Sequence, residues 1–252
     1  MAKAVYLGVG GQSRKVQKMY IGIGGQAKRI FKAYIGVGGQ AKVFFFDLDA
    51  SYERVEYIDA ATEGPYIVLP ITTQEGLKLN FKAAWTWNSN PTTYLGGGTG
   101  AYKAMRFRFH DGDGATVQGE GEVDVPHSNA NQIAAGNVVR DTLADVEIDF
   151  GDYNGTRAGH LTVAGDTYNF TRIALENPGS QMGLFAWIGS SGPTVKRGRF
   201  GEVKAYDKNN DLIMDFIPVV KRTGRVPGFF DLVSMKFYGN VGTGSFTAGP
   251  SV

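Results

Sequence analysis

Cysteine is absent from all 252 residues of the sequence. Without it, neither a disulfide scaffold nor a thiolate metal site can form. No stretch approaches the roughly 18 consecutive apolar residues of a membrane-spanning helix. The first residues also lack the uninterrupted apolar core and cleavage site of a secretory signal. We therefore expect that the protein does not insert into a membrane and that packing or assembly stabilises it. If it acts outside a cell, it is expected to leave by a route such as lysis.

Acidic side chains are missing from residues 1–46, which carry eight Lys or Arg. The whole chain has 26 basic and 24 acidic residues, so removing those eight leaves 18 basic and 24 acidic in residues 47–252, a net charge of −6. This asymmetry predicts two parts with different partners, an N-terminal module over 1–46 and a larger domain over 47–252.

Proline is also scarce, with 9 residues against 36 glycines. The glycines follow no Gly-X-Y period, which excludes collagen and indicates many tight turns between short strands. An apolar fraction of 42% and an aromatic fraction of 12% are enough for a packed core, so extensive disorder is excluded.

A repeat with a period of 14 residues occupies the N-terminal module. Its segments, YLGVGGQSRKVQKM, YIGIGGQAKRIFKA and YIGVGGQAKVFFFD, align without gaps. Each contains a Gly-Gly-Gln sequence that suits a tight turn. The positions expected to serve assembly recur at the same place in every repeat: Tyr6, Tyr20, Tyr34, Gly10, Gly24 and Gly38.

Between these turns the residues alternate, which predicts a strand of about ten residues over 28–37 and a small antiparallel meander. Such a sheet cannot bury its apolar face alone, so it must pack on its own domain, on another protein or on copies of itself. An anchoring or oligomerising role is favoured. Nucleic-acid binding is the weaker interpretation, because no aromatic platform flanked by arginines is laid out for base stacking.

The sequence of the larger domain predicts many short strands separated by polar, glycine-rich turns. Residues 77–87 place Leu77, Leu79, Phe81 and both tryptophans on one face, and residues 105–110 and 146–150 alternate in the same way. No segment has a helical period of useful length. The pattern predicts an all-β fold, with antiparallel sheets packed as a sandwich or jelly roll.

The C-terminal part carries a more specific resemblance. The segments that carry it are KAYD at 204–207, DFIP at 215–218, GFFDLVSMKFY at 228–238 and GTGSFTAG at 242–249. Together with residues 57–71 and the predicted late core strand at 182–192, they resemble the concanavalin-like (laminin-G-like) jelly rolls of phage tail and fibre proteins. The YIGVGG repeats are similar to repeats that lead such proteins.

The resemblance implies a bacteriophage virion structural protein of the tail, baseplate or fibre, exposed on the particle after assembly in the host cytoplasm. Its jelly roll is expected to contact host-surface polysaccharide, and its repeats to bind other virion proteins and form a homo-oligomer. A capsid decoration or head-fibre protein with a purely architectural role is the alternative. A tail-associated glycan hydrolase is a third interpretation.

Sugar binding by such folds uses aromatic faces and amide side chains in loops. Two segments fit, Trp87–Tyr94 running on to Tyr102, and the amide-rich stretch 127–132. Trp87 could equally belong to the core, as its alternation indicates. The predicted glycan-binding residues are Trp87, Asn88, Asn90, Tyr94, Tyr102, Asn129 and Asn131.

Two acidic clusters are candidates for a catalytic or metal site. Glu147, Asp149 and Asp152 approach the paired carboxylates of a retaining glycosidase, although a solvated strand face is favoured. Glu120, Glu122 and Asp124 share a strand face, which is more typical of an exposed or metal-coordinating edge than of a catalytic pair.

The other candidate motifs favour ordinary structure. His110–Asp113 is better explained by an Asp-Gly hairpin turn than by a calcium loop. His110, His127 and His160 have no metal spacing. Gly96–Gly100 lacks the Lys-Ser/Thr of a phosphate loop, so a flexible loop is expected there. We therefore predict a non-enzymatic protein with no cofactor, no catalytic residue and no metal site.

Overall fold

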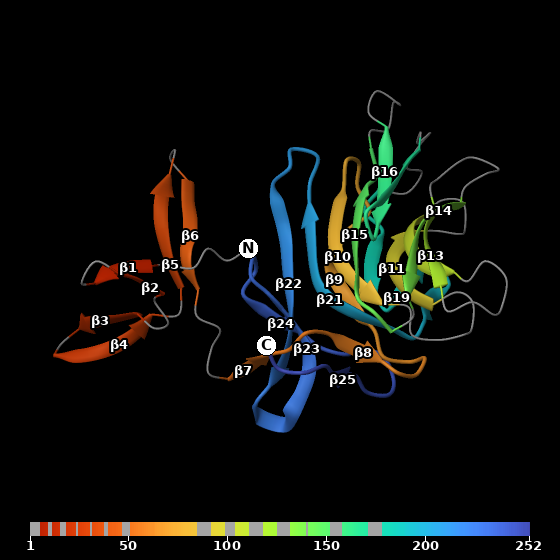
Figure 1. The fold of residues 1–252 in the computed structure, drawn as a ribbon. Helices are drawn as coiled ribbons and strands as arrows, with labels where there is room; N and C mark the ends of the chain where they lie inside the picture. Colours follow the sequence, from red (N-terminus) through yellow and green to blue (C-terminus); the bar gives the residue numbers. More distant parts are fainter. Residues whose placement is uncertain are drawn as a thin grey trace. The chain divides into compact units, whose positions relative to one another are not determined.

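The chain forms two units, Met1–Glu53 and Arg54–Val252. The predicted boundary lay between residues 46 and 47. The computed structural model in Figure 1 describes residues 6–9, 12–15, 19–23, 25–30, 32–37, 40–46, 51–84, 92–98, 104–110, 118–124, 132–139, 141–151, 158–170 and 178–252. Within these ranges, no helix is long and apolar enough to cross a membrane.

Each 14-residue repeat forms its own antiparallel hairpin. The strands are β1 (Tyr6–Val9) with β2 (Gln12–Lys15), β3 (Met19–Ile23) with β4 (Gln26–Ile30), and β5 (Lys32–Val37) with β6 (Gln40–Phe46). In each pair, the strand ends face each other across the two glycines, as in the Ile23–Gln26 pairing. Gly25 has a φ of 76°, the left-handed conformation that glycine adopts most readily. The turn prediction is therefore confirmed.

The predicted ten-residue strand over 28–37 is wrong. Residues 28–30 end β4 of one hairpin, while residues 32–37 form β5 of the next. The reason is local, because a two-residue glycine turn lets each repeat fold back on itself. Residues 28–30 pair with β3, which precedes them, and residues 32–37 pair with β6, which follows them.

The middle hairpin exposes apolar side chains. Tyr20 is 57% exposed, Ile21 is 49% exposed and Ile23 is 52% exposed. The register places Ile21 and Ile23 on one face and Tyr20 on the other, because neighbouring residues in a strand point to opposite sides. Neither face of β3 is covered within its unit, as expected for a two-stranded sheet that cannot bury its own side chains.

The second unit is a sandwich of two sheets (Figure 1). The larger sheet has the order β17-β16-β15-β10-β21-β22-β23-β24, with β7, β8 and β25 attached at its side. Its strands are β7 (Tyr52–Arg54), β8 (Ile58–Ala60), β10 (Lys78–Ala84), β15 (Ala144–Asp149), β16 (Gly159–Val163), β17 (Asp166–Phe170), β21 (Gly198–Tyr206), β22 (Leu212–Lys221), β23 (Val226–Asp231), β24 (Lys236–Tyr238) and β25 (Thr247–Ala248).

The smaller sheet has the order β14-β13-β12-β11-β19-β20, and the pair β9–β18 lies beside it. Neighbouring strands are antiparallel except for β11 and β19, which run parallel. The strands are β9 (Ile67–Thr72), β11 (Thr92–Gly98), β12 (Ala104–His110), β13 (Gln118–Asp124), β14 (Gln132–Val139), β18 (Gln181–Leu184), β19 (Ala186–Gly189) and β20 (Gly192–Val195). A short 3₁₀ turn at Thr223–Arg225 is the one helical element in the described part of the chain.

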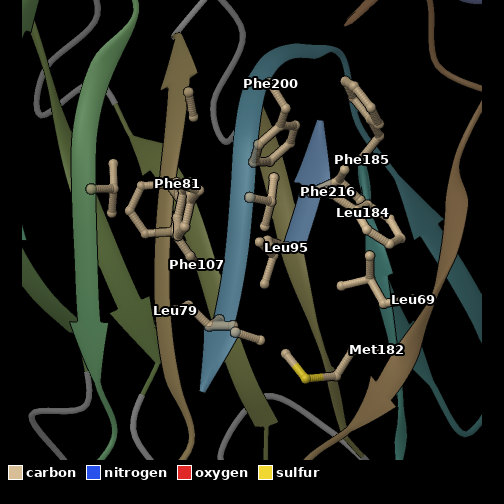
Figure 2. Close-up of a cluster of buried hydrophobic side chains, with 14 of the residues drawn as sticks. Leu69, Leu79, Phe81, Leu95, Phe107, Met182, Leu184, Phe185, Phe200 and Phe216 are labelled. Carbon is tan, nitrogen blue, oxygen red and sulfur yellow. The ribbon is translucent and has the colours of Figure 1, made fainter. Parts of the chain in front are cut away.

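The core lies between the two sheets and is rich in phenylalanine. Figure 2 shows Phe81 and Phe107 meeting between them, with ring centroids 5.0 Å apart in an edge-to-face arrangement. Phe200 and Phe185 form a second such pair at 5.0 Å. The alternation predicted over 77–87, 105–110 and 146–150 is confirmed for residues 77–83, 105–109 and 146–150, because the inward residues of these segments are buried. Trp85 and Trp87 lie outside the described residues. The predicted all-β fold, antiparallel hairpins followed by a jelly-roll sandwich, is confirmed as well.

The last residues of the chain close over the start of the sandwich. Backbone N–H groups of Gly249 and Val252 donate to the carbonyls of Tyr57 and Arg54 at 2.9 Å and 3.2 Å. In the other direction, Glu56 N–H donates to the carbonyl of Pro250 at 2.9 Å. The segment that enters the sandwich from the N-terminal unit is therefore held by the C-terminal segment.

The motif residues behind the phage resemblance are structural. The buried carboxylate of Asp231, in the DLV motif, accepts backbone N–H groups from Asp215 at 2.9 Å, Val233 at 3.1 Å and Ser234 at 3.0 Å. Asn240 Oδ1 likewise accepts from Tyr66 N–H at 3.0 Å and holds the turn that follows β24. Asp231 and Asn240 therefore hold turns of the sandwich.

Candidate functional site

Strand β12 carries two arginines on the side of its sheet that faces away from the core. Met105, Phe107 and Phe109 are buried inward, and Arg106 and Arg108 alternate with them. The sequence pattern predicts this orientation. It does not predict that Arg106 and Arg108 are only 8% and 9% exposed. Buried guanidinium groups require charged or polar partners, which makes this face of the sheet the first candidate for a specific role.

The neighbouring strand, β13, places an acid opposite each of these cations. The register pairs Arg106 with Asp124, Arg108 with Glu122, and His110 with Glu120. Residues directly opposite in an antiparallel ladder share a face, and opposite charges there attract. The backbone register therefore brings the three acidic positions of β13 level with Arg106, Arg108 and His110. Within the described residues, no group of three or more potential metal ligands occurs.

A row of residues continues from this ladder across the sheet. Arg106 is opposite Gly96 on β11, Gly96 is opposite Trp187 on β19, and Trp187 is opposite Thr194 on β20. Because Gly96 has no side chain, the Arg106 guanidinium reaches over the Trp187 ring, with 5.2 Å between its central carbon and the ring centroid. A cation over an aromatic face at this distance is attracted by the ring quadrupole.

Gly96 is required by the backbone as well as by this contact. A Cβ atom there would lie 2.3 Å from the carbonyl oxygen of Met105 and 2.7 Å from the Cα of Arg106. At Gly97 it would lie 2.1 Å from the carbonyl oxygen of Gln181. The expected flexible loop at 96–100 is therefore wrong for residues 96–98, which form the end of β11 in close contact with neighbouring backbone.

Trp187 is half-buried on this outward face, and sequence reasoning missed it. Residues 182–192 were predicted as a core strand, and Met182, Leu184 and Ala186 are indeed buried. Trp187 comes next and points outward, with its six-membered ring 3.1 Å from the ideal Cβ position of Gly189. Its indole Nε1 is buried and has no hydrogen-bond partner in the described structure. Alternation counted from Ala186 would have identified it.

The outward face of the larger sheet holds two candidate catalytic carboxylates, Glu147 and Asp149. Glu147 Oε1 lies 3.1 Å from His160 Nε2 on β16. Asp149 is buried, accepts the Gly151 N–H at 2.8 Å, and has Lys78 Nζ 3.7 Å from its other oxygen. Both acids thus have partners that a structural role explains, and Asp152 lies outside the described residues.

The predicted glycan-binding loops fall mostly outside the described residues. This applies to Trp87, Asn88, Asn90, Tyr102, Asn129 and Asn131. Tyr94 belongs to the backbone of β11, so the predicted loop gives way to a strand from Thr92 onward. His127 and Asp113 also lie outside the described residues, and His110 ends β12.

The predicted assembly residues lie on the hairpins. Tyr20 is exposed on β3, and the equivalent Tyr6 and Tyr34 lie on β1 and β5. Their glycine partners Gly10, Gly24 and Gly38 fall in the turns, outside the described residues.

Comparison with known proteins does not assign the chain to a family. No protein-family model and no curated protein matches the chain. Nine solved chains match. One of them, a proposed carbohydrate-binding protein from Bacteroides ovatus, is 11% identical, with a TM-score of 0.45 over 90% of this chain and 68% of that one.

Proposed function

We propose that this protein is a bacteriophage virion structural protein of the tail, baseplate or fibre. Its sandwich binds a glycan on the host surface, and its N-terminal hairpins join it to other virion proteins and to further copies of itself. The virion assignment is supported by the sequence resemblance of residues 198–250 and of the YIGVGG repeats. The glycan assignment rests on the outward face of the smaller sheet.

The observation that carries glycan binding is the Arg106–Trp187 pair on that face. An indole is a flat apolar surface, and the Trp187 side chain is half-buried. The guanidinium group of Arg106, which lies over this ring, is a strong hydrogen-bond donor. A stacking surface beside such a group suits a sugar ring, which is apolar on its faces and polar at its edges.

The N-terminal hairpins support attachment to the particle. Ile21 and Ile23 are exposed on one face of β3–β4, and a two-stranded sheet gains stability when such a face is covered. Three similar hairpins in one chain also give several points of attachment. Many copies on one particle then allow weak individual glycan contacts to sum to firm adsorption.

We propose no catalytic role for the chain. Glu147 is engaged by His160, and Asp149 by the Gly151 N–H and Lys78, so both carboxylates have structural partners. Release of reducing sugar from a bacterial polysaccharide by the parent protein, abolished in Glu147→Gln, would contradict this.

The full chain should be applied to an array of bacterial capsular and lipopolysaccharide glycans, together with Trp187→Ala and Tyr168→Ala. Tyr168 is a matched control, because it is an aromatic residue 52% exposed on the edge strand of the other sheet. We expect binding by the parent and by Tyr168→Ala, and its loss in Trp187→Ala. Absence of binding by the folded parent, or equal binding by Trp187→Ala, would overturn the glycan assignment. Immunogold labelling of intact virions tests the location.

A further inference from the structure

The strand β17 ends the larger sheet without the features that usually keep a sheet edge from pairing. Its first four residues, 166–169, are all exposed, and its pairing with β16 contains no bulge. The strand has no lysine, arginine or proline, whereas the edge strand β20 of the smaller sheet contains the exposed Pro193. Lysine, proline and bulges prevent sheet edges from pairing with another chain, so β17 is open to such pairing.

The backbone of β17 directs a defined set of groups away from the sheet. The turn that joins β16 to β17 has two residues with φ values of 50° and 95°, as in a type I′ hairpin. The Ala164 N–H donates to the carbonyl of Asp145 on β15 at 3.0 Å. Because the bonding direction alternates along a strand, Tyr168 bonds to β16, while Thr167 and Asn169 direct their N–H and carbonyl groups outward.

A row of core-facing side chains ends at β17 with an exposed aromatic residue. Leu79, Ile148 and Leu161 lie opposite one another on β10, β15 and β16, and all three are fully buried. Tyr168 is the next residue in this row, and it is 52% exposed. An aromatic side chain at the open end of a buried row gains apolar contact when a second row adjoins it.

From these observations we infer that two copies of the chain pair through β17, antiparallel and about a two-fold axis beside Tyr168. In this register Thr167 of each copy lies opposite Asn169 of the other. Each of these pairs exchanges two backbone hydrogen bonds, so four bonds form and the outward-directed groups of both residues are satisfied. Such an interface is complementary to itself and closes with two copies.

The same register joins the two buried rows. Tyr168 lies opposite its equivalent in the second copy, in a non-hydrogen-bonded pair, where facing side chains are closest. The larger sheets of the two copies then become one continuous sheet. This pairing involves neither the N-terminal hairpins nor the Arg106–Trp187 face, so it goes beyond the proposed function and does not depend on glycan binding.

Because the chain has no native cysteine, cross-linking of the full chain tests this register. Opposite Cα atoms in a non-hydrogen-bonded pair are about 4.5 Å apart, which a disulfide can span, so Tyr168→Cys should form a linked dimer under mild oxidation. Thr167→Cys is the matched control and should not, because its two Cα atoms would lie about 8 Å apart. No linked dimer of Tyr168→Cys, or equal linking of both variants, would overturn the inference.

Light scattering gives a second measurement, on the full chain with Ile21→Ser and Ile23→Ser to remove the exposed apolar face of β3. This protein should have twice the chain mass of 27.2 kDa. Adding Tyr168→Lys should halve that mass, because like charges then lie directly opposite, and Tyr168→Phe should retain it. Unchanged melting temperatures establish that each variant folds. A monomer before Tyr168 is replaced, or a mass unaffected by Tyr168→Lys, would overturn the pairing and leave the glycan proposal standing.

Discussion

The guanidinium carbon of Arg106 lies 5.2 Å from the ring centroid of Trp187, although the strand that carries Gly96 runs between theirs. The contact needs three residues in one row: the cation of Arg106, the aromatic ring of Trp187, and Gly96 between them, which has no side chain to separate the two. Because Gly96 also abuts the backbone of β12, the empty position is enforced by strand packing and not only by the contact.

A double-mutant cycle on Arg106→Leu and Trp187→Leu should therefore detect coupling. We expect an interaction free energy of about 0.5–2 kcal/mol in the free energy of unfolding, the range for a partly desolvated cation–π contact. Denaturant unfolding of the four proteins measures it. Additive effects within about 0.3 kcal/mol would mean that the two side chains are neighbours without a stabilising contact.

Gly96→Ala should destabilise the sandwich by about 1–3 kcal/mol, because its methyl group must displace the backbone at Met105 and Arg106. Gly22→Ala is the control. A Cβ at Gly22 meets nothing within 4 Å, and the residue lies in the N-terminal unit. Thermal unfolding should show a lowered melting temperature for the first variant and an unchanged sandwich transition for the second.

The sequence allowed the sandwich to be predicted because period-two alternation reports burial directly. Leu79, Phe107 and Ile148 lie inward as their patterns require. The same rule failed for residues 28–37, where alternation continues past the end of one hairpin into the next. Alternation identifies faces, but it does not identify which strands pair.

The candidate site depends on pairing and was therefore harder to predict. From the sequence alone, Glu122 and Asp124 are typical of an exposed or metal-coordinating edge. The strand register, which the sequence does not show, places them opposite Arg108 and Arg106. Trp187 lies far from Arg106 in the sequence, and the parallel pairing of β11 with β19 brings it to the same row. Contacts of such sequence separation leave no local pattern.

Asp231→Ala should be among the most damaging substitutions in the sandwich. It removes the acceptor of three backbone N–H groups in a buried site, and each unsatisfied buried donor costs about 1–3 kcal/mol. We expect a loss of at least about 3 kcal/mol in the free energy of unfolding. Asp207→Ala, which removes an acceptor from two N–H groups in an exposed turn, should cost about 1 kcal/mol or less.

Gly249→Leu tests the closure of the sandwich by its C-terminal segment. A Cβ at Gly249 would lie 2.8 Å from the Tyr57 ring, so the larger side chain should separate the terminal segment from residues 54–57. We expect a destabilisation of about 1–3 kcal/mol. Faster amide exchange at Glu56 should accompany it, because that N–H donates to Pro250. Val252→Ala, at a position 72% exposed, should leave both measurements unchanged.

Replacing Ile21 and Ile23 by Ser should weaken assembly without affecting the sandwich. Both side chains project from the same face of β3, which we propose to be covered when copies of the chain associate. Light scattering on the full chain should show a multiple of the 27.2 kDa chain mass, and a lower mass for the double variant. Ala27→Ser, on the opposite face of the hairpin, is the matched control and should retain the parent mass. A parent protein that is monomeric at all concentrations would contradict self-association and leave other virion proteins as the partners of this face.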